Sequence, residues 1–344
     1  MKIKLTKQEK NWILYDVGNS AFTLLAATIL PIYFNYIAGK QGLSDVQYLA
    51  YWGYAVSIAT LLTALAGPVF GTVADTKGYK KPVFTIALGI GAIASVALGF
   101  AKYWLAFLVV FVIAKVGYSV TLVFYDSMLV DVTLEDRMDE VSSQGYAWGY
   151  IGSCVPFVIC LLVVLNAGKI GITMEIAMMV SFVIITVWWV IMTLPLLKTY
   201  HQKYYVEKKQ HAFSESFKRI GITLKNVKKE KKVFLFLLAF FFYIDGVYTI
   251  IDMATAYGSA LGLSSTGLLL ALLLTQIVAF PFAIIFGRLA KKYSAEKLIT
   301  VCIVAYLGVA IFAIFLHYQW QFWVLAVWVG MFQGGVQALS RSYF

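Results

Sequence analysis

This sequence is short of charged residues. Asp, Glu, Lys and Arg make up 13% of its 344 residues, whereas hydrophobic residues make up 61%. A soluble domain carries about a quarter charged residues, so this composition excludes a water-facing surface over most of the chain. We therefore expect a lipid bilayer to surround most of it.

Cysteine and histidine are also scarce, with three residues of each. Cys154, Cys160 and Cys302 lie in apolar segments without CxxC spacing, which argues against a disulfide framework or a metal site. The sequence contains no Walker-type nucleotide loop, no HExxH and no GxSxG motif. We therefore expect no metal, no cofactor, no ATP-driven transport and no enzymatic activity.

Long apolar runs are what the sequence has in abundance. A helix needs about 20 such residues to cross the hydrocarbon core, and it pairs its own backbone groups there. We predict an all-α multi-pass protein with ten spanning helices at residues 12–37, 48–73, 82–101, 104–128, 143–166, 173–197, 233–257, 264–288, 295–316 and 320–342.

Lysine and arginine are unevenly divided between the predicted loops. They gather at the N-terminus and in the loops after the second, sixth and eighth helices, whereas the loops on the opposite side hold Lys40, Lys102 and Lys169. The loop after the fourth helix is acidic, and acids carry little weight in the rule that basic loops stay in the cytoplasm. We expect a cytoplasmic N-terminus in a plasma membrane, or in a vacuolar membrane if the source is eukaryotic. The net charge of +11 then reports topology and not a nucleic-acid partner.

The basic segment between the sixth and seventh helices divides the chain. Its apolar residues recur at helical spacing with lysines on the other face, which favours an amphipathic helix on the inner leaflet over a solvated tether. These residues are Phe213, Phe217, Ile220, Leu224 and Val227. We predict an N-terminal six-helix bundle over 1–197, a linker over 198–232 and a C-terminal bundle over 233–344.

A short polar turn follows the second predicted helix and has a degenerate copy after the eighth. Phe70-Gly71-x-x-Ala74 matches Phe286-Gly287-x-x-Ala290, and repeated halves are typical of transporters that rock about a central site. The first turn continues with Asp75, Gly78, Lys80 and Lys81. In this set it resembles the signature loop of the major facilitator superfamily, which implies that these residues help to close the cytoplasmic side.

Three further strings narrow the resemblance. They are Trp12-Ile-Leu-Tyr15-Asp16-x-x-Asn19-Ser20-Ala21-Phe22, Tyr243-x-Asp245-Gly246 and Gln333-Gly334-Gly335-x-Gln337-Ala338-Leu339-Ser340-Arg341. In these the chain resembles the vacuolar amino-acid effluxers, or autophagy-related permeases, and their bacterial relatives. The resemblance implies two helical bundles, a monomer and amino-acid substrates. It also implies twelve helices, so we expect the chain to be a fragment or to lack the last two.

Polar and ionisable residues inside the predicted spans mark the candidate pathway, because such groups are costly in lipid and usually face a cavity. They lie on helices one, four, seven and ten, the set that the resemblance implies lines a central cavity. The candidates for the substrate or proton pathway are Asp16, Asn19, Lys115, Asp126, Asp245, Tyr248, Asp252, Gln333, Gln337 and Arg341.

The depth of these residues suggests how they pair. At about 1.5 Å per residue, Lys115 and Asp245 both fall near the middle of the bilayer, and we expect them to form an ion pair across the cavity. Asp252 falls near the outer mouth. Asp16 and Asp126 fall near the inner surface, where they can form an inner gate with Arg341 or, equally, be interfacial acids in contact with water.

The predicted function is secondary active transport of small polar metabolites, with amino acids as the implied class, by alternating access and with coupling to protons. One alternative is a membrane enzyme in which the acidic loop after the fourth helix binds a metal beside a lipid-linked substrate. We prefer to pair those acids with the nearby basic turns. Another alternative is a sensor that keeps the transporter scaffold without transport.

Overall fold

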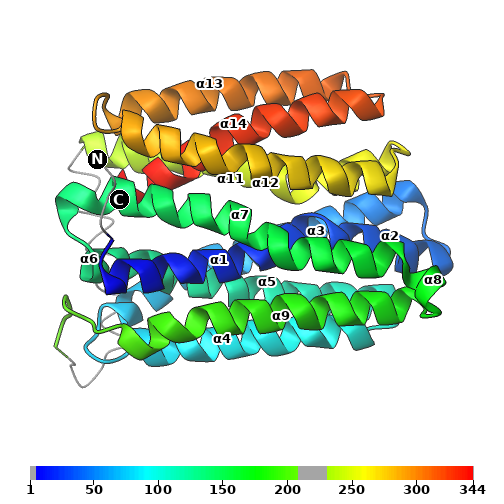
Figure 1. Ribbon diagram of the computed structural model, residues 1–344, viewed down its shortest axis with the longest axis horizontal. Helices are drawn as coiled ribbons and strands as arrows, with labels where there is room; N and C mark the ends of the chain where they lie inside the picture. The colour runs from blue at the N-terminus through cyan, green and yellow to red at the C-terminus, as the bar shows by residue number, and fades with distance from the viewer. Residues whose placement is uncertain (1–4, 208–230, 344) are drawn as a thin grey trace.

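The computed structural model describes residues 5–207 and 231–343, and it is a bundle of long, nearly parallel helices (Figure 1). The long helices of the first half are α1 (Lys7–Ala27), α2 (Ile29–Lys40), α3 (Asp45–Ala74), α4 (Lys80–Ala97), α5 (Trp104–Ser127), α7 (Met138–Leu165) and α9 (Met174–Thr199). The long helices of the second half are α11 (Lys231–Ala260), α12 (Ser265–Leu289), α13 (Ala295–Ile314) and α14 (Gln319–Tyr343). Two short helices, α6 (Leu129–Val132) and α8 (Ala167–Ile170), connect longer helices in the first half.

The described residues contain ten helical spans that are long and apolar enough to cross a membrane, as predicted. α1 and α2 together form the first of these spans. They are separated at Thr28, whose backbone leaves helical geometry with φ −123° and ψ −76°. Pro31 lies three residues further on, and because proline has no backbone N–H it cannot bond the carbonyl of Ala27.

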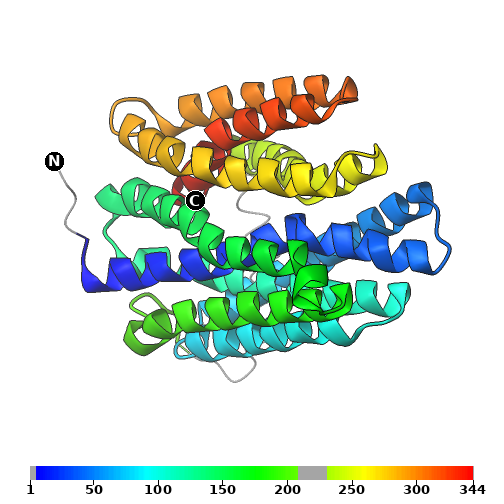
Figure 2. The ribbon, with the colours of Figure 1, turned by 45° about the vertical axis from the view of Figure 1, so that its right-hand side comes forward.

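The helices gather into two groups. α11, α12, α13 and α14 lie together on one side, and α1, α4, α5 and α9 lie on the other, with α7 between them in both views (Figures 1 and 2). α7 packs against α1 within the first bundle and against α12 and α14 of the second. It is therefore the main seam between the bundles.

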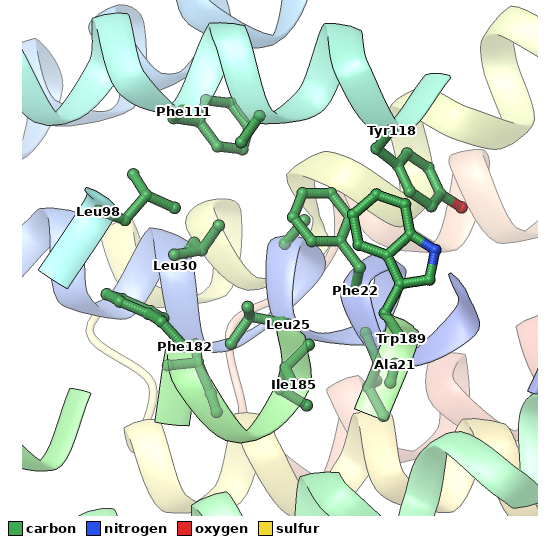
Figure 3. Close-up of a cluster of buried hydrophobic side chains, with 14 of the residues drawn as sticks. Ala21, Phe22, Leu25, Leu30, Leu98, Phe111, Tyr118, Phe182, Ile185 and Trp189 are labelled. Carbon is green, nitrogen blue, oxygen red and sulfur yellow. The ribbon is translucent and has the colours of Figure 1, made fainter. Parts of the chain in front are cut away.

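Aromatic side chains fill the core of the first bundle (Figure 3). Phe22 of α1 lies against Tyr118 of α5 and Trp189 of α9, with ring centroids 4.8 Å and 5.4 Å away. At glycine positions the backbones of neighbouring helices meet directly. A Cβ on Gly117 of α5 would lie 2.8 Å from the backbone nitrogen of Gly91 in α4. Small residues permit this close approach between membrane helices.

A second repeat supports the two-half architecture. Gly42-Leu43-Ser44 links α2 to α3, and Gly262-Leu263-Ser264 links α11 to α12. Both glycines have positive φ, 80° and 75°, and each following leucine donates its N–H to a carbonyl of the preceding helix. Sequence reasoning overlooked this pair because three common turn residues carry little weight before their shared geometry is known.

The two ends of the bundle differ in charge. One end holds the loops after α3 and after α12, and we call it the basic end. Its lysines include Lys77, Lys81, Lys291 and Lys292. The amphipathic helix predicted from Phe213 to Val227 lies outside the described residues.

Candidate functional site

A cavity of about 280 Å³ lies between the two bundles. Seven of the predicted pathway residues line it, and they come from α1, α5, α11 and α14. They are Asp16, Asn19, Asp126, Tyr248, Gln333, Gln337 and Arg341. Lys115, Asp245 and Asp252 do not line the cavity.

At the basic end the cavity is bounded by Arg341, in the last turn of α14. Its Nη1 lies 3.0 Å from Asp16 Oδ2 in α1 and 3.7 Å from Asp126 Oδ1 in α5. Its Nε donates to Ser142 Oγ at 2.9 Å and its Nη2 to the Ser142 carbonyl at 2.8 Å, both in α7. We call Asp16, Asp126, Ser142 and Arg341 the basic-end clamp, which joins one helix of the second bundle to three of the first.

Aromatic rings and one glycine hold the clamp in place. The Arg341 guanidinium lies 4.0 Å from the ring centroid of Tyr146 and 4.6 Å from that of Trp12, so cation–π attraction adds to the ion pair. Gly145 leaves room for both charges, because a Cβ there would lie 2.3 Å from Asp16 Oδ2 and 2.9 Å from Arg341 Nη2. Any larger residue at this position displaces one of them.

Amides and hydroxyls continue the polar lining next to the clamp. Tyr150 OH donates to Gln337 Oε1 at 2.6 Å across the bundles, and Asn19 Nδ2 donates to Asp16 Oδ1 at 3.3 Å. Further from the clamp the lining turns apolar, with Leu272, Val309, Phe322, Leu325, Ala326 and Val329. The cavity therefore has one polar and one apolar end.

The expected pair between Lys115 and Asp245 is wrong. Lys115 Nζ instead lies 2.9 Å from Asp252 Oδ1, and both side chains are about one-tenth exposed. Asp252 is therefore a buried ion-pair partner and not an exposed acid at the mouth, whereas Asp245 is exposed. The reason is that α11 meets the first bundle through its last third. The described hydrogen bonds between them involve Asp252, Thr255 and Ser259.

The opposite end of the cavity is closed by this part of α11. Thr255 Oγ1 donates to the carbonyl of Ala27 at 2.5 Å, the group that Pro31 cannot bond within the helix. Trp52 Nε1 donates to the carbonyl of Asp252 at 3.4 Å. We call Lys115, Asp252, Thr255 and Ala27 the opposite-end clamp.

The predicted gating loop is tied to its own bundle. Lys80 is buried and its Nζ lies 3.2 Å from Asp131 Oδ2, while Asp131 also accepts bonds from Tyr200 OH and from the backbone N–H of Lys203 and Tyr204. Burial and the Asp131 carboxylate raise the pKa of Tyr200. The cluster fixes the loop after α3 against the chain that follows α9.

The remaining gating residues lie around that cluster. Asp75 caps α3 and accepts Val206 N–H at its carbonyl at 2.7 Å, and Gly78 turns the chain with φ 78°. Lys81 is exposed, and a Cβ on Gly71 would have no neighbour within 4 Å. The described bonds of the first turn therefore run to the first bundle and to the chain that follows α9.

The degenerate second turn contacts the other bundle. Lys291 Nζ lies 3.0 Å from Glu140 Oε1 of α7, and a Cβ on Gly287 would lie 2.6 Å from the Ser143 side chain. With Asp131 on Lys80, this confirms the predicted pairing with basic turns for two acids of the acidic loop, Asp131 and Glu140.

Comparison with known proteins places the chain in a family. The model of the family described as Vacuole effluxer Atg22 like matches residues 6–344. The chain belongs to this Atg22-like family. It is 44% identical over 349 residues to the uncharacterized MFS-type transporter YxiO of Bacillus subtilis, covering all of this chain and 82% of YxiO. It is 23% identical to autophagy-related protein 22 of Vanderwaltozyma polyspora, covering 99% of this chain and 80% of that protein.

Solved structures give the same fold. The human organic anion transporter MFSD10 matches with a TM-score of 0.63 at 12% identity, covering 98% of this chain and 85% of that one. The proton:xylose symporter XylE matches with a TM-score of 0.60 at 14% identity, with the same coverages of 98% and 85%. Together with the family match and the 44% identity to YxiO, this fold makes the Atg22-like chain a membrane transporter of the major facilitator type.

Sequence reasoning missed the contribution of α7 to the site of this Atg22-like protein. Ser142, Gly145, Tyr146 and Tyr150 all contact clamp or cavity residues. Their signal was present as Gly145-x-x-x-Gly149, a small-residue spacing that predicts close helix packing. This spacing carries little weight by itself, because charged residues are the stronger mark of a site within the membrane and α7 has none in its middle.

Proposed function

We propose that the chain is a secondary active transporter that moves small polar metabolites, in the first place amino acids, by alternating access. The observation that supports this best is a central cavity with a clamp between the bundles at each of its ends. Opening one clamp at a time exposes the cavity to one side of the membrane and then to the other. In this proposal residues 1–197 and 233–344 are the moving bundles and 198–232 joins them.

The chemistry of the cavity supports a zwitterionic substrate. Asp126 can accept bonds from an ammonium group, and the amides of Gln333 and Gln337 can meet a carboxylate. The apolar end suits an aliphatic or aromatic side chain. The family description as a vacuole effluxer agrees with export from a compartment.

The proposed orientation follows the basic end. Lys77, Lys81, Lys291 and Lys292 lie there, and basic loops stay in the cytoplasm. We place this end, with the N-terminus, on the cytoplasmic side of a plasma membrane or of a vacuolar membrane, and we propose that the transporter works as a monomer.

The test is uptake and counterflow in proteoliposomes with labelled amino acids, nucleosides and pentoses. We expect one or more amino acids to exchange faster than the others. Gln337→Leu removes an amide that we propose meets the substrate carboxylate, and we expect it to raise KM several-fold, because a lost hydrogen bond costs about 0.5–1.5 kcal/mol. Gln144→Leu, on α7 and outside the cavity lining, is the matched control and should leave KM unchanged. Absence of flux for every solute would contradict the proposal.

A further inference from the structure

Among the described residues, each buried carboxylate has a basic partner of its own, whereas Asp126 at the cavity shares the partner of Asp16. Among the described residues, the buried acids Glu9, Asp16, Asp131 and Asp252 each form an ion pair with a separate basic residue. Their partners are Arg137, Arg341, Lys80 and Lys115. Such matching is what a low-dielectric interior requires.

Asp126 is the exception. It lines the cavity, its side chain is 45% exposed, and its nearest cation is Arg341 at 3.7 Å, which Asp16 already holds at 3.0 Å. Two carboxylates thus share one guanidinium, and the polar end of the cavity carries one negative charge in excess. Like charges that share a site favour uptake of a proton by one of them.

The remaining titratable groups around Asp126 do not supply the missing positive charge. The groups that interact with it electrostatically are Arg341 from α14, Asp16 and Tyr15 from α1, Tyr146 from α7, Tyr248 from α11 and Tyr125 from its own helix. The tyrosines are neutral when protonated, so Arg341 is the one cation in this group.

We propose that Asp126 is the site that binds the coupling proton, and that its protonation favours opening of the basic end. This proposal rests on the transport function proposed above, and it identifies the coupling ion as a proton and its binding residue as Asp126. Arg341 belongs to the second bundle, whereas Asp16 and Asp126 belong to the first. Opening the basic end removes Arg341 and leaves both carboxylates without a cation, so the open state binds a proton more tightly than the closed one. By linkage, a lower pH then favours the open state.

The experiment measures opening without any substrate. Spin labels on cysteines at Asp136 and Lys292, exposed residues of the first and second bundles at the basic end, report the separation of the bundles. The three native cysteines are buried, so the introduced ones carry the labels. We expect the wild-type distance distribution to shift to longer separations between about pH 8 and about pH 5. Asp126→Asn should show the longer separations at every pH.

Two further variants keep the test decisive. Asp126→Glu retains a carboxylate and should retain the pH response, whereas Glu140→Gln removes the rim ion pair with Lys291 and should leave the response in place. A full pH response in Asp126→Asn, or its loss in Glu140→Gln, overturns the proposal, and a wild-type response to Na⁺ in place of pH overturns the choice of ion. Since no solute is used, a pH response without measurable flux would reject the transport proposal and retain the proton site.

Discussion

Both clamps hold the two bundles together across the cavity, but they do so with different chemical groups. The opposite-end clamp has one cation and one anion, Lys115 and Asp252, together with a hydrogen bond from Thr255 to a backbone carbonyl. The basic-end clamp has one cation and two anions within 3.7 Å. The first is neutral as built, whereas the second becomes neutral when it gains a positive charge.

The difference in net charge predicts that the opposite-end clamp holds the bundles together at any pH, whereas the basic-end clamp responds to protons and charged ligands. A neutral buried pair has little reason to respond to protons or charged ligands. A cluster with an excess carboxylate facing the cavity responds to both, because each added cation lowers its electrostatic free energy. The following substitutions test this division, from the largest expected effect to the smallest.

Removing either cation should be the most damaging change. Lys115→Met leaves Asp252 buried and unpaired, and Arg341→Met leaves Asp16 unpaired; breaking a buried pair costs about 3–5 kcal/mol. We expect both variants to unfold at clearly lower temperature in detergent.

The paired substitutions distinguish the clamps. Lys115→Met with Asp252→Leu should recover most of the lost stability, because no charge remains at that end. Arg341→Met with Asp16→Leu should recover less, because Asp126 stays without a cation. If both double variants regain the same unfolding temperature, the excess carboxylate of Asp126 does not affect the stability of the protein.

Filling the space at Gly145 should damage the basic-end clamp alone. In Gly145→Ala the new Cβ overlaps Asp16 Oδ2, and overpacking of this kind costs about 1–3 kcal/mol. We expect transport to fall by about tenfold, which corresponds to the lower part of that range, and the pH response of the label distance to change. Gly89→Ala in α4, where a Cβ has no neighbour within 4 Å, is the matched control and should behave as wild type.

Thr255 should show a smaller, separable contribution at the opposite end. Thr255→Val removes the donor to the Ala27 carbonyl, at a cost of about 1 kcal/mol in unfolding free energy. Pro31→Ala restores an N–H that can bond this carbonyl within the helix. In a double-mutant cycle we therefore expect Thr255→Val to cost less when Pro31 is already alanine, and additive effects would show that the two residues do not share this carbonyl.

The rim pair should matter least. Glu140→Gln breaks the bond to Lys291, whose side chain is 61% exposed, and pairs of this kind contribute about 0–1 kcal/mol. We expect no resolvable change in unfolding temperature and a slight increase in the rate of exchange transport. A large loss of transport would show that the ion pair between Glu140 and Lys291, and not Arg341, controls opening at the basic end.

Much of the architecture was predictable because it depends on local composition. Apolar runs predict spans, and Lys115, Asp16 and Arg341 can be recognised as intramembrane charges from position alone. Their partners were less accessible. Asp245 and Asp252 are seven residues apart and share an ideal helix face, yet one is exposed and the other is 6% exposed. Depth counted along a straight helix does not indicate which part of α11 meets the first bundle.

The sequence by itself determined the number of spans, their repeated halves, the membrane setting and which charged residues lie within the spans. The repeat follows from recurring motifs, and the other features follow from the free energy of placing a side chain or a peptide group in lipid. The tertiary structure decided which charges pair, that the second turn crosses the seam between the bundles, and that α7 supports Arg341. Those features depend on contacts of a few ångströms between helices far apart in the chain. The break at Thr28, the glycine at 145 and the packing of α11 set those contacts together, and no one helix specifies them alone.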